Sequence, residues 1–262
     1  MSSNVMHVAK TGLNAQQLRL QVISNNLANV NTMGFKRDRP NFETLLYQTQ
    51  RPAGAPTSEA TQAIAPTNLG TGVRLVSTDK IHTQGALTTT DNALDLAVQG
   101  SGFFQVLLPD GQTGYTRNGI FSQNADGIVT TMSGYVLQPE MQVPADATSI
   151  TVSRDGIVSV TLPGDVQPLE IGQVTLAQFV NPRGLAPLGE NFLAETAASG
   201  APIVSAPLQD GAGDLVQGAL ETSNVNVVQE LVEMIEAQRA YEINSRSISA
   251  SDEMMSYLTN QL

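Results

Sequence analysis

The sequence contains no cysteine and only two histidines, His7 and His82. The absence of cysteine excludes disulfides, thiolate catalysis and cysteine-ligated metals, and it leaves the redox compartment open. His7 lies in an N-terminal helical pattern and His82 near the start of a β-prone region, so neither has a partner for a catalytic triad or a metal site. We therefore predict a protein that is not an enzyme, with no catalytic residues, no metal and no cofactor.

Positive charge and long apolar runs are also scarce. Thirteen basic residues stand against twenty-four acidic ones, for a net charge of −11, which argues against nucleic acid as a partner. No run approaches the roughly 20 apolar residues that span a bilayer, so we expect no direct membrane insertion. The N-terminal residues lack the apolar segment of a secretory signal peptide. If the protein leaves the cytoplasm, we expect it to use another route.

The clearest positive feature is an uninterrupted helical pattern over residues 221–262. Asn226 is a candidate N-cap with Gln229 three residues later, and neither glycine nor proline follows it. Apolar residues then recur every seven positions, which predicts a narrow coiled-coil seam that needs a partner helix. The predicted C-terminal seam consists of Val227, Leu231, Met234, Tyr241, Ile248, Met255 and Leu262.

A matching pattern over residues 1–36 predicts an N-terminal coiled-coil helix, which we expect to stop near residues 31–34 with Gly34 as a left-handed C-cap. Residues 1–39 carry five bases and one acid, net +4, whereas residues 221–262 carry seven acids and two bases, net −5. The two helices are therefore expected to pair, with apolar burial supplying most of the free energy. The predicted N-terminal seam consists of Met6, Ala9, Leu13, Leu20, Ile23, Leu27 and Val30.

Between the helices, turn signals predict a β-rich domain over residues 73–198. Residues 37–72 predict a short amphipathic helix followed by a linker rich in proline and glycine, and residues 199–220 predict a second linker that returns to the C-terminal helix. The overall prediction is an α+β fold, in which long terminal helices form a coiled-coil domain beside a central all-β domain. The hairpin signals of the β domain are Asp110-Gly111, Asn118-Gly119, Asp126-Gly127, Ser133-Gly134 and Asp155-Gly156.

Two short patterns have both a chemical and a structural interpretation. Gly100-Ser101-Gly102 resembles half of a dinucleotide-binding fingerprint, but no helical pattern follows it, so a tight turn before a strand is favoured. Glu230, Glu233 and Glu236 recur every three residues, a spacing that suits carboxylate catalysis or Ca²⁺ binding. We favour a solvated or partner-facing helix stripe for these three acids.

A third pattern is the basic cluster Lys36, Arg37 and Arg39. Three positive charges are too few to form a stable anchor on an anionic membrane. We therefore expect these side chains to pair with acids on a neighbouring segment of the protein.

Four segments together resemble the axial proteins of the bacterial flagellum, the rod and hook family. Residues 95–106 and 115–134 are similar to that family's central motifs. Residues 223–244 are similar to its C-terminal signature, most clearly at Gln238, Arg239, Ala240 and Tyr241. Residues 24–37 resemble the N-terminal signature at Asn25, Asn26, Leu27, Ala28, Asn29, Thr32, Gly34, Phe35 and Lys36. Four motifs in order over nearly the whole chain make a specific resemblance.

Residues 45–49 and 70–73, around the proline-rich insert, are similar to the distal-rod members of that family. The resemblance implies a structural subunit that polymerises through its terminal helices into a rigid hollow shaft and transmits motor torque to the hook. It implies contacts with further copies, proximal-rod and hook subunits and the surrounding periplasmic and outer-membrane rings. It also implies type III export without a cleaved signal peptide, and a location in the basal body, where the rod crosses the periplasm.

Two alternatives remain at this level. The chain could be another flagellar axial subunit, from the proximal rod or the hook. It could also be a non-flagellar β-rich scaffold or adhesin whose terminal helices pair only within one chain. An enzyme that uses acids of the β domain, such as a glycosidase, is a distant third.

Overall fold

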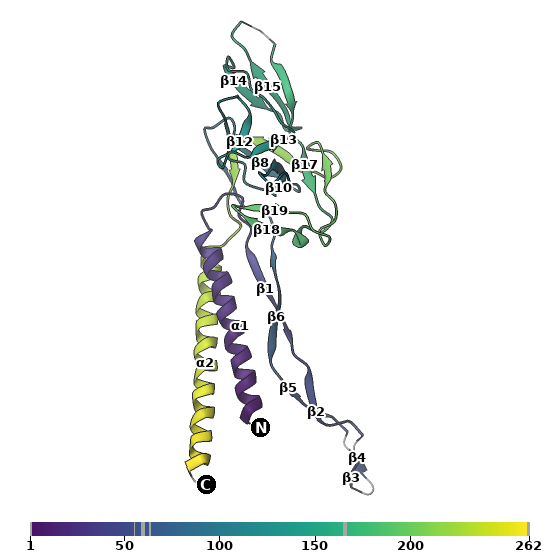
Figure 1. Cartoon of the computed structure of the whole chain (residues 1–262), viewed down its shortest axis with the longest axis vertical. Coiled ribbons are helices and arrows are strands. Elements are labelled where there is room, and N and C mark those ends of the chain that lie inside the picture. Colours follow the sequence, from purple (N-terminus) through teal and green to yellow (C-terminus); the bar gives the residue numbers. More distant parts are fainter. Residues whose placement is uncertain (1, 55, 59–60, 63, 165–166, 261–262) are drawn as a thin grey trace. The chain divides into compact units, whose positions relative to one another are not determined.

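A computed structural model describes residues 2–54, 56–58, 61–62, 64–164 and 167–260. The chain divides into two compact units. We call them the helix–ribbon unit, residues 1–27, 38–79 and 226–262, and the β unit, residues 28–37 and 80–225. Two long terminal helices and an intervening β-rich region confirm the predicted α+β class (Figure 1). The coiled-coil geometry of the helices stays a prediction.

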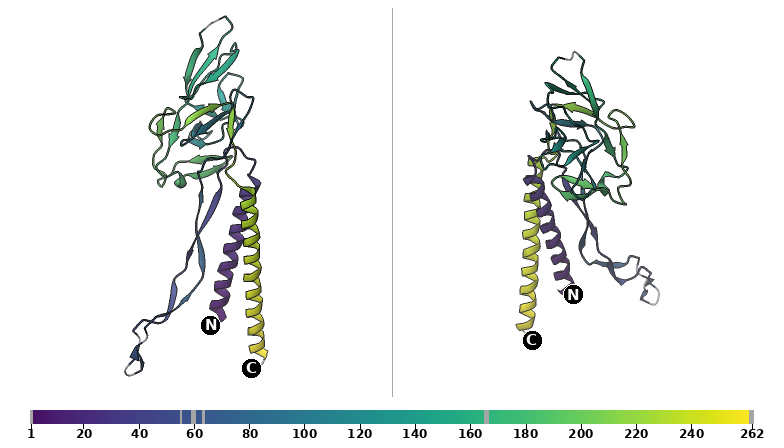
Figure 2. Two further views of the ribbon diagram at one scale, coloured as in Figure 1. Left: turned by 180° about the vertical axis from the view of Figure 1, so that it is seen from behind. Right: turned by 45° about the horizontal axis from the view of Figure 1, so that its top comes forward.

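The two long helices are α1 (Ser2–Ala28) and α2 (Val227–Asn260), and they lie side by side in all the views of Figures 1 and 2. α2 begins where the sequence predicts, because the side-chain oxygen of Asn226 accepts hydrogen bonds from the backbone N–H of Val228 at 3.0 Å and of Gln229 at 3.3 Å. Neither described helix combines the length and apolar character needed to cross a membrane.

The predicted segments 1–36 and 221–262 each extend beyond the helix that they contain. α1 ends at Ala28, and residues 29–34 form turns, so the predicted helical segment 1–36 is too long and Val30 lies outside the helix. The predicted C-terminal segment starts at 221, but Glu221 closes the strand β22 (Ala219–Glu221) and α2 starts six residues later. Asparagines at 25, 26, 29 and 31 favour turns over helix and explain the early end of α1.

Most described residues between 38 and 70 lie in strands, so the predicted short helix is wrong and the predicted linker is a paired ribbon. β1 (Asp38–Thr44) pairs with β6 (Val73–Lys80), and β2 (Tyr47–Arg51) pairs with β5 (Thr67–Gly70). At the tip, β3 (Pro56–Ser58) pairs with β4 (Thr61–Gln62). These pairs form a long two-stranded ribbon (Figure 1). Because β2 and β5 are exposed on both faces, they lack the alternation of apolar and polar residues that signals a strand.

The β unit contains one large sheet and several small ones. Its seven-stranded sheet has the order β11-β12-β13-β9-β10-β19-β18, and its three-stranded sheet has the order β14-β15-β16. Three further strand pairs are β17-β20, β21-β8 and β22-β7, and a 3₁₀ turn covers Pro182–Gly184. The remaining strand bounds are β7 Leu87–Thr89, β8 Leu96–Gln99, β9 Phe104–Leu107, β10 Thr113–Thr116, β11 Phe121–Gln123, β12 Val129–Thr131, β13 Val136–Gln138, β14 Ser149–Val152, β15 Ile157–Thr161, β16 Leu169–Gln173, β17 Leu176–Gln178, β18 Ala186–Gly189, β19 Phe192–Ala194, β20 Ile203–Ser205 and β21 Asp214–Gln217.

Four of the five predicted hairpin turns are confirmed. Gly111, Gly127, Gly134 and Gly156 have φ values of 80°, 78°, 85° and 86°, and each lies between two paired antiparallel strands. The fifth is wrong, because Asn118-Gly119 joins β10 to β11, which are not neighbours in the sheet. Gly119 is required there for another reason: a Cβ would lie 1.6 Å from the carbonyl oxygen of Leu96.

The core of the β unit includes part of the segment that the sequence predicts as a second linker. Residues 199–220 contain β20 and β21, and Leu215 of β21 is only 1% exposed among Phe104, Phe121 and Leu137. The linker prediction for 199–220 is therefore wrong. Glycines and prolines there make turns between very short strands, a composition that resembles a linker when read locally.

Candidate functional site

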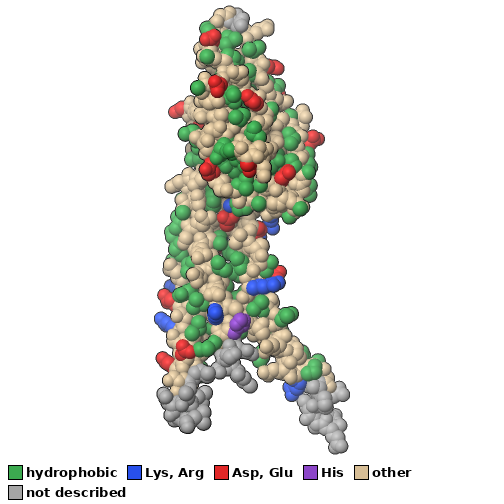
Figure 3. Space-filling model, viewed as in Figure 1, with side chains coloured by type: hydrophobic (Ala, Val, Ile, Leu, Met, Phe, Trp, Pro, Cys, Tyr) green, Lys and Arg blue, Asp and Glu red, His purple; other side chains and the backbone are tan. Residues whose placement is uncertain are grey.

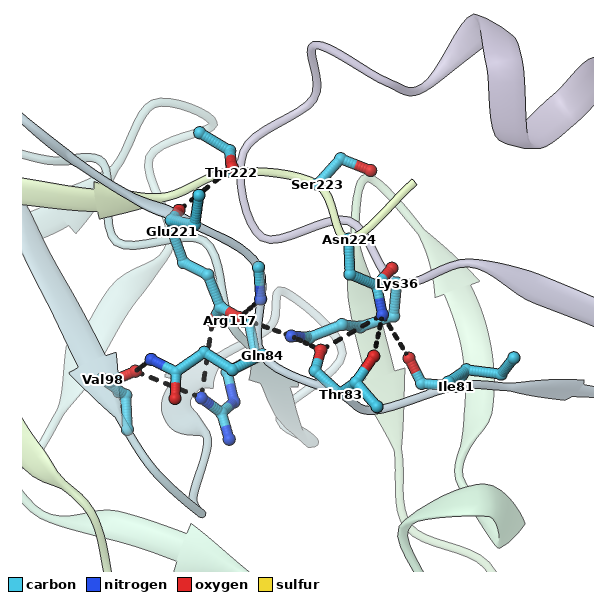
Figure 4. A network of polar contacts seen from close by, with 12 residues as sticks. Lys36, Ile81, Thr83, Gln84, Val98, Arg117, Glu221, Thr222, Ser223 and Asn224 are labelled. Carbon is cyan, nitrogen blue, oxygen red and sulfur yellow. Dashed lines mark hydrogen bonds and ion pairs between the residues drawn. The ribbon is translucent and has the colours of Figure 1, made fainter. Parts of the chain in front are cut away.

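Several polar residues of the β unit converge on one buried carboxylate, that of Glu221 (Figure 4). Its side chain has no exposed area and lies 2.5 Å from Lys36 Nζ and 3.4 Å from Arg117 Nη1. The backbone N–H of Gly85 also donates to the carboxylate, at 2.8 Å. Lys36 Nζ donates a second hydrogen bond to the carbonyl of Thr83 at 2.8 Å. One acid thus links three segments that are distant in the sequence.

Asn224 completes this arrangement, which we call the polar clamp: Lys36, Arg117, Glu221 and Asn224. The Asn224 side-chain oxygen accepts from the backbone N–H of Arg37 at 2.8 Å, and its amide donates to the carbonyls of Ile81 at 2.8 Å and Thr83 at 3.1 Å (Figure 4). The clamp therefore holds the segment that leaves α1 beside the segment that leads to α2.

Gly34 is a second requirement of the clamp. Its backbone N–H donates to the carbonyl of Glu221 at 2.7 Å, and its φ is +69°. A Cβ at this position would lie 2.5 Å from the backbone of Arg117 and Asn118. The predicted left-handed conformation of Gly34 is confirmed, but its role is a close backbone approach and not the C-cap of α1, which ends six residues earlier.

Burial shapes the electrostatics of the clamp. Burial lowers the pKa of Lys36, and the adjacent Glu221 carboxylate opposes that shift. Burial also lowers the pKa of Arg117, again opposed by Glu221, and the Arg117 guanidinium lies 5.2 Å from the centre of the Phe103 ring. The ion pairs are thus enclosed, so removal of one charge leaves the others uncompensated.

His82 packs against the Phe103 ring, with 5.5 Å between ring centres, and its pKa is lowered to about 4. The causes are burial first, then the positive charges of Lys36 and Arg117. The folded state resists protonation of this imidazole, whereas the unfolded chain accepts a proton near pH 6.5, so the unfolded state binds more protons between pH 4 and 6.5.

We expect the free energy of unfolding of the β unit to fall by about 2–3 kcal/mol from His82 alone as the pH drops from 7 to 4. Urea unfolding of the wild type and of His82→Gln across this range isolates the effect from the titration of carboxylates. The free energy of unfolding of the wild type, relative to that of His82→Gln, should fall as the pH drops below 6.5. A constant difference would contradict the assignment.

In the helix–ribbon unit, Asn26 and Glu230 form a second buried polar group. Asn26 is 1% exposed; its side-chain oxygen accepts from the backbone N–H of Asp38 at 2.9 Å, and its amide donates to the Asp38 carbonyl at 2.9 Å. The same amide donates to the Glu230 carboxylate at 3.3 Å. Glu230 has no exposed area, so of the two predicted environments, solvated or partner-facing, the solvated one is excluded and the carboxylate faces α1.

The two helices contact each other through small and polar side chains of α2. Ala237 is fully buried and Ser251 is 6% exposed, and a Cβ at Gly12 of α1 would lie 3.2 Å from the Asn244 amide. Together with Glu230 these residues recur every seven positions, so they share one side of α2. Small side chains allow the two helices to approach closely. This buried column lies beside the predicted seam and was missed because it contains no large apolar residue.

Among the described residues, an opposite-charge contact between the helices, as predicted, is present at Arg19. Arg19 Nη2 of α1 lies 3.7 Å from the Glu233 carboxylate and 3.8 Å from the Glu236 carboxylate of α2. The basic cluster also finds acids as predicted, since Lys36 pairs with Glu221 and Arg39 pairs with Asp79 at 3.1 Å. The partly exposed pairs of Arg19 and Arg39 add at most about 1 kcal/mol each, whereas the Lys36–Glu221 pair is buried.

The predicted N-terminal seam follows the covered side of α1. Ala9 and Ile23 are buried, Met6, Leu13, Leu20 and Leu27 are half-buried, and Val30 lies in the turn after the helix. The C-terminal seam is less enclosed: Met234 and Ile248 are half-buried, whereas Val227, Leu231 and Tyr241 are 39%, 43% and 37% exposed. The Met255 side chain and all of Leu262 lie outside the described residues. In the C-terminal motif, Gln238 and Arg239 are exposed and Ala240 is half-buried.

A different set of apolar side chains is exposed along α2. We call it the exposed stripe: Val228, Val232, Ile235, Ile243, Ala250, Met254 and Tyr257. The spacings are combinations of three and four residues, so these side chains share one side of the helix. Six of the seven are large, and each of those is at least 50% exposed. The stripe lies on the opposite side of α2 from the buried column and is exposed to solvent.

The other sequence-derived candidates form no chemical site within the described part of the chain. His7 is exposed on α1, and His82 is enclosed beside the clamp. Gly100 and Gly102 have φ values of 113° and 134° in the turn between β8 and β9, as the structural interpretation predicts. Among the described residues, no three His, Asp or Glu side chains converge on a position that could hold a metal ion.

Comparison with known proteins matches three family models to this chain. Residues 6–36 match "Flagella basal body rod protein", residues 97–160 match "Flagellar hook protein FlgE/F/G D1 domain", and residues 216–262 match "Flagellar basal body rod FlgEFG protein C-terminal". The first and third contain Lys36, Glu221 and Asn224, and the second contains Arg117, so the polar clamp unites all three regions.

Similar proteins cover almost the whole chain. The flagellar basal-body rod protein FlgG of Buchnera aphidicola subsp. Acyrthosiphon pisum is 54% identical over 96% of this chain and 97% of its own length. That of Caulobacter vibrioides is 48% identical over 98% of both chains. The flagellar hook protein FlgE of Treponema pallidum is 45% identical, but over only 49% of this chain and 27% of its own length. The chain therefore belongs to the flagellar basal-body rod protein family.

Proposed function

We infer that this chain is a structural subunit of the flagellar distal rod, located in the flagellar basal body. Its terminal helices assemble copies into a rigid hollow helical shaft that transmits motor torque to the hook. The near-complete similarity to basal-body rod proteins supports this function over the proximal-rod and hook alternatives. Similarity to a hook protein over half the chain supports a shared mode of contact with neighbouring axial subunits.

The observation that carries the proposal is the exposed stripe on α2. Ile243 is 67% exposed, Met254 63% and Tyr257 64%, although all three lie on a long helix whose other side already packs against α1. Large apolar side chains gathered on one exposed helix face mark an interaction surface. Repetition of that contact between identical copies generates a helical polymer when the rotation does not close a ring.

The polar clamp gives this polymer a way to carry load. It holds the segments after α1 and before α2 together through Glu221 and Asn224 inside the β unit. Force applied to either terminal helix therefore reaches the β unit through two adjacent, cross-linked chain segments. We also propose that the β unit contacts the surrounding rings. The subunit is proposed to be exported by the flagellar type III apparatus without a cleaved signal peptide.

Concentration-dependent assembly tests the function. We expect the purified protein to remain monomeric when dilute and to form long straight tubes above a critical concentration, as seen by negative-stain electron microscopy. A scaffold or adhesin with helices paired only within the chain stays monomeric at all concentrations. In basal bodies, a tag on this subunit should label the distal rod; a label at the proximal rod or in the hook would favour the other axial roles.

We further expect the terminal helices to be ordered only in the polymer. In the monomer, α2 covers α1 mainly through small and polar side chains, and this burial offsets little of the conformational entropy lost when the helices become ordered. Hydrogen exchange of the dilute monomer should find protected amides in the β unit and fast exchange across residues 3–31 and 226–260. Strong protection throughout these terminal segments would contradict the expectation.

A further inference from the structure

The helix–ribbon unit contains a groove of about 670 Å³ between α1, α2 and the ribbon. Its lining includes Val8, Ala9 and Gly12 of α1, Leu69 and Gly72 of the ribbon, and Ser247 of α2. The volume is in the range of about 300–1,000 Å³ that is common for binding pockets. Figure 3 shows apolar side chains beside the hollow between the helices and the ribbon.

Glycine allows the ribbon to lie close to α1, and the missing side chain leaves space at the bottom of the groove. A Cβ at Gly72 would lie 2.2 Å from Thr11 Oγ1, and the backbone N–H of Val73 donates to the same oxygen at 3.4 Å. The walls are apolar and open, since Val8 is 38% exposed and Leu69 is 40% exposed. A groove with this space at its bottom and with apolar walls can accommodate apolar side chains that protrude from another surface.

The exposed stripe has the complementary shape. With Arg239 and Arg246 included, its positions are 228, 232, 235, then 239, 243, 246, then 250, 254, 257, so the spacing 4-3-4 repeats every eleven residues. An eleven-residue repeat follows 3.67 residues per turn and stays on one side of a nearly straight helix, unlike a heptad, which drifts by about 20° per repeat. Both arginines lie in the middle third, whereas the last third, Ala250, Met254 and Tyr257, contains no arginine, as does the first third.

The charge of the elements that line the groove is also complementary to the charge at the end of α2. α1 contains Lys10 and Arg19 and no acid, and the described strands β2 and β5 contain Arg51 and no acid. The end of α2 around the last third of the stripe carries exposed Asp252 and Glu253 and no base between residues 247 and 260. Most of the basic side chains on the face in Figure 3 lie over the helices and the ribbon.

We propose that the groove receives the Ala250–Tyr257 part of the exposed stripe from a second copy of this chain. This interface rests on the proposed function and specifies one contact of the polymer. Met254 and Tyr257 of one copy enter between Val8 and Leu69 of the next, and Glu253 lies toward the basic elements that line the groove. The ribbon is thereby one wall of the site.

The absence of native cysteine allows a direct test by cross-linking. Subunits with Leu69→Cys are mixed with subunits with Met254→Cys, assembled, and treated with a short bis-maleimide. A heterodimer can then arise only between copies. Ser256→Cys is the matched control, because Ser256 is exposed two residues away on another side of α2. Proximity in the interface should give at least about tenfold more heterodimer from Met254→Cys than from Ser256→Cys.

The outcomes separate this interface from the function itself. Tubes in which Leu69→Cys and Met254→Cys give no more heterodimer than the control overturn the groove assignment and leave the rod function intact. Failure of the unsubstituted protein to form tubes under any condition overturns both. As a second variant, Glu253→Lys should raise the critical concentration for assembly, and unchanged assembly would also count against the interface.

Discussion

Replacement of Glu221 by glutamine is expected to lower the free energy of unfolding of the β unit by about 3–5 kcal/mol. The substitution keeps the shape of the side chain but removes the only acid in contact with Lys36 and Arg117 among the described residues. Both cations then remain enclosed without a counter-charge, while glutamine still accepts the hydrogen bond from the Gly85 N–H. Such a loss is a large part of the stability of a domain.

The measurement is urea unfolding followed by far-UV circular dichroism, because the chain contains no tryptophan. Glu170→Gln is the matched control: it makes the same chemical change at an exposed position of β16 and should alter the stability by less than about 0.5 kcal/mol. A loss for Glu221→Gln as small as that of the control would refute the account of the clamp. Addition of Lys36→Met to Glu221→Gln should recover part of the loss, since it removes one uncompensated charge.

The clamp also illustrates what local sequence patterns cannot predict. The sequence predicts that Lys36 pairs with an acid, but Glu221 lies 185 residues away, in a short strand at the boundary between the predicted linker and the predicted C-terminal segment. No periodicity connects the two. A charged residue directly after the apolar pair Ala219-Leu220 is the one local signal, since such residues are rarely buried unless they are paired.

Features set by neighbouring residues are predicted well. Asn226 caps α2, and Gly111, Gly127, Gly134 and Gly156 form their hairpin turns, because backbone conformation and capping depend on a few adjacent positions. Asn118-Gly119 has the same dipeptide chemistry, yet there glycine is needed for a contact with Leu96. The ribbon is missed for the opposite reason, since strands exposed on both faces need no apolar pattern.

The helix seams fall between these two cases. Their heptad spacing correctly predicts two helices that need partners, but a straight helix drifts by about 20° per heptad. Along the column Val227 and Tyr241 are 39% and 37% exposed, whereas Met234 and Ile248 are half-buried. Side chains of Glu230, Ala237 and Ser251 occupy the covered face instead. Periodicity identified the need for a contact but not the side of α2 that makes it within the chain.

Ile243→Asp is the second substitution with a large expected effect, and its target is assembly. Ile243 is 67% exposed in the centre of the stripe, so an aspartate there costs the subunit at most about 0.7 kcal/mol through helix propensity. In the polymer the same carboxylate is enclosed without a partner, which costs about 3 kcal/mol or more and raises the critical concentration at least about a hundredfold. Sedimentation of assembled tubes over a concentration series measures the shift.

Tyr241→Asp separates the two helix faces. Tyr241 belongs to the heptad seam and is 37% exposed, whereas Ile243 belongs to the exposed stripe. If neighbouring copies contact both faces, both substitutions abolish assembly at ordinary concentrations and leave the circular dichroism of the β unit unchanged. Ser249→Asp, an exposed position away from the stripe, should assemble normally. Normal tubes from Tyr241→Asp would restrict subunit contacts to the stripe, and normal tubes from Ile243→Asp would refute the stripe as an assembly surface, because no other described face of α2 gathers so many exposed apolar side chains.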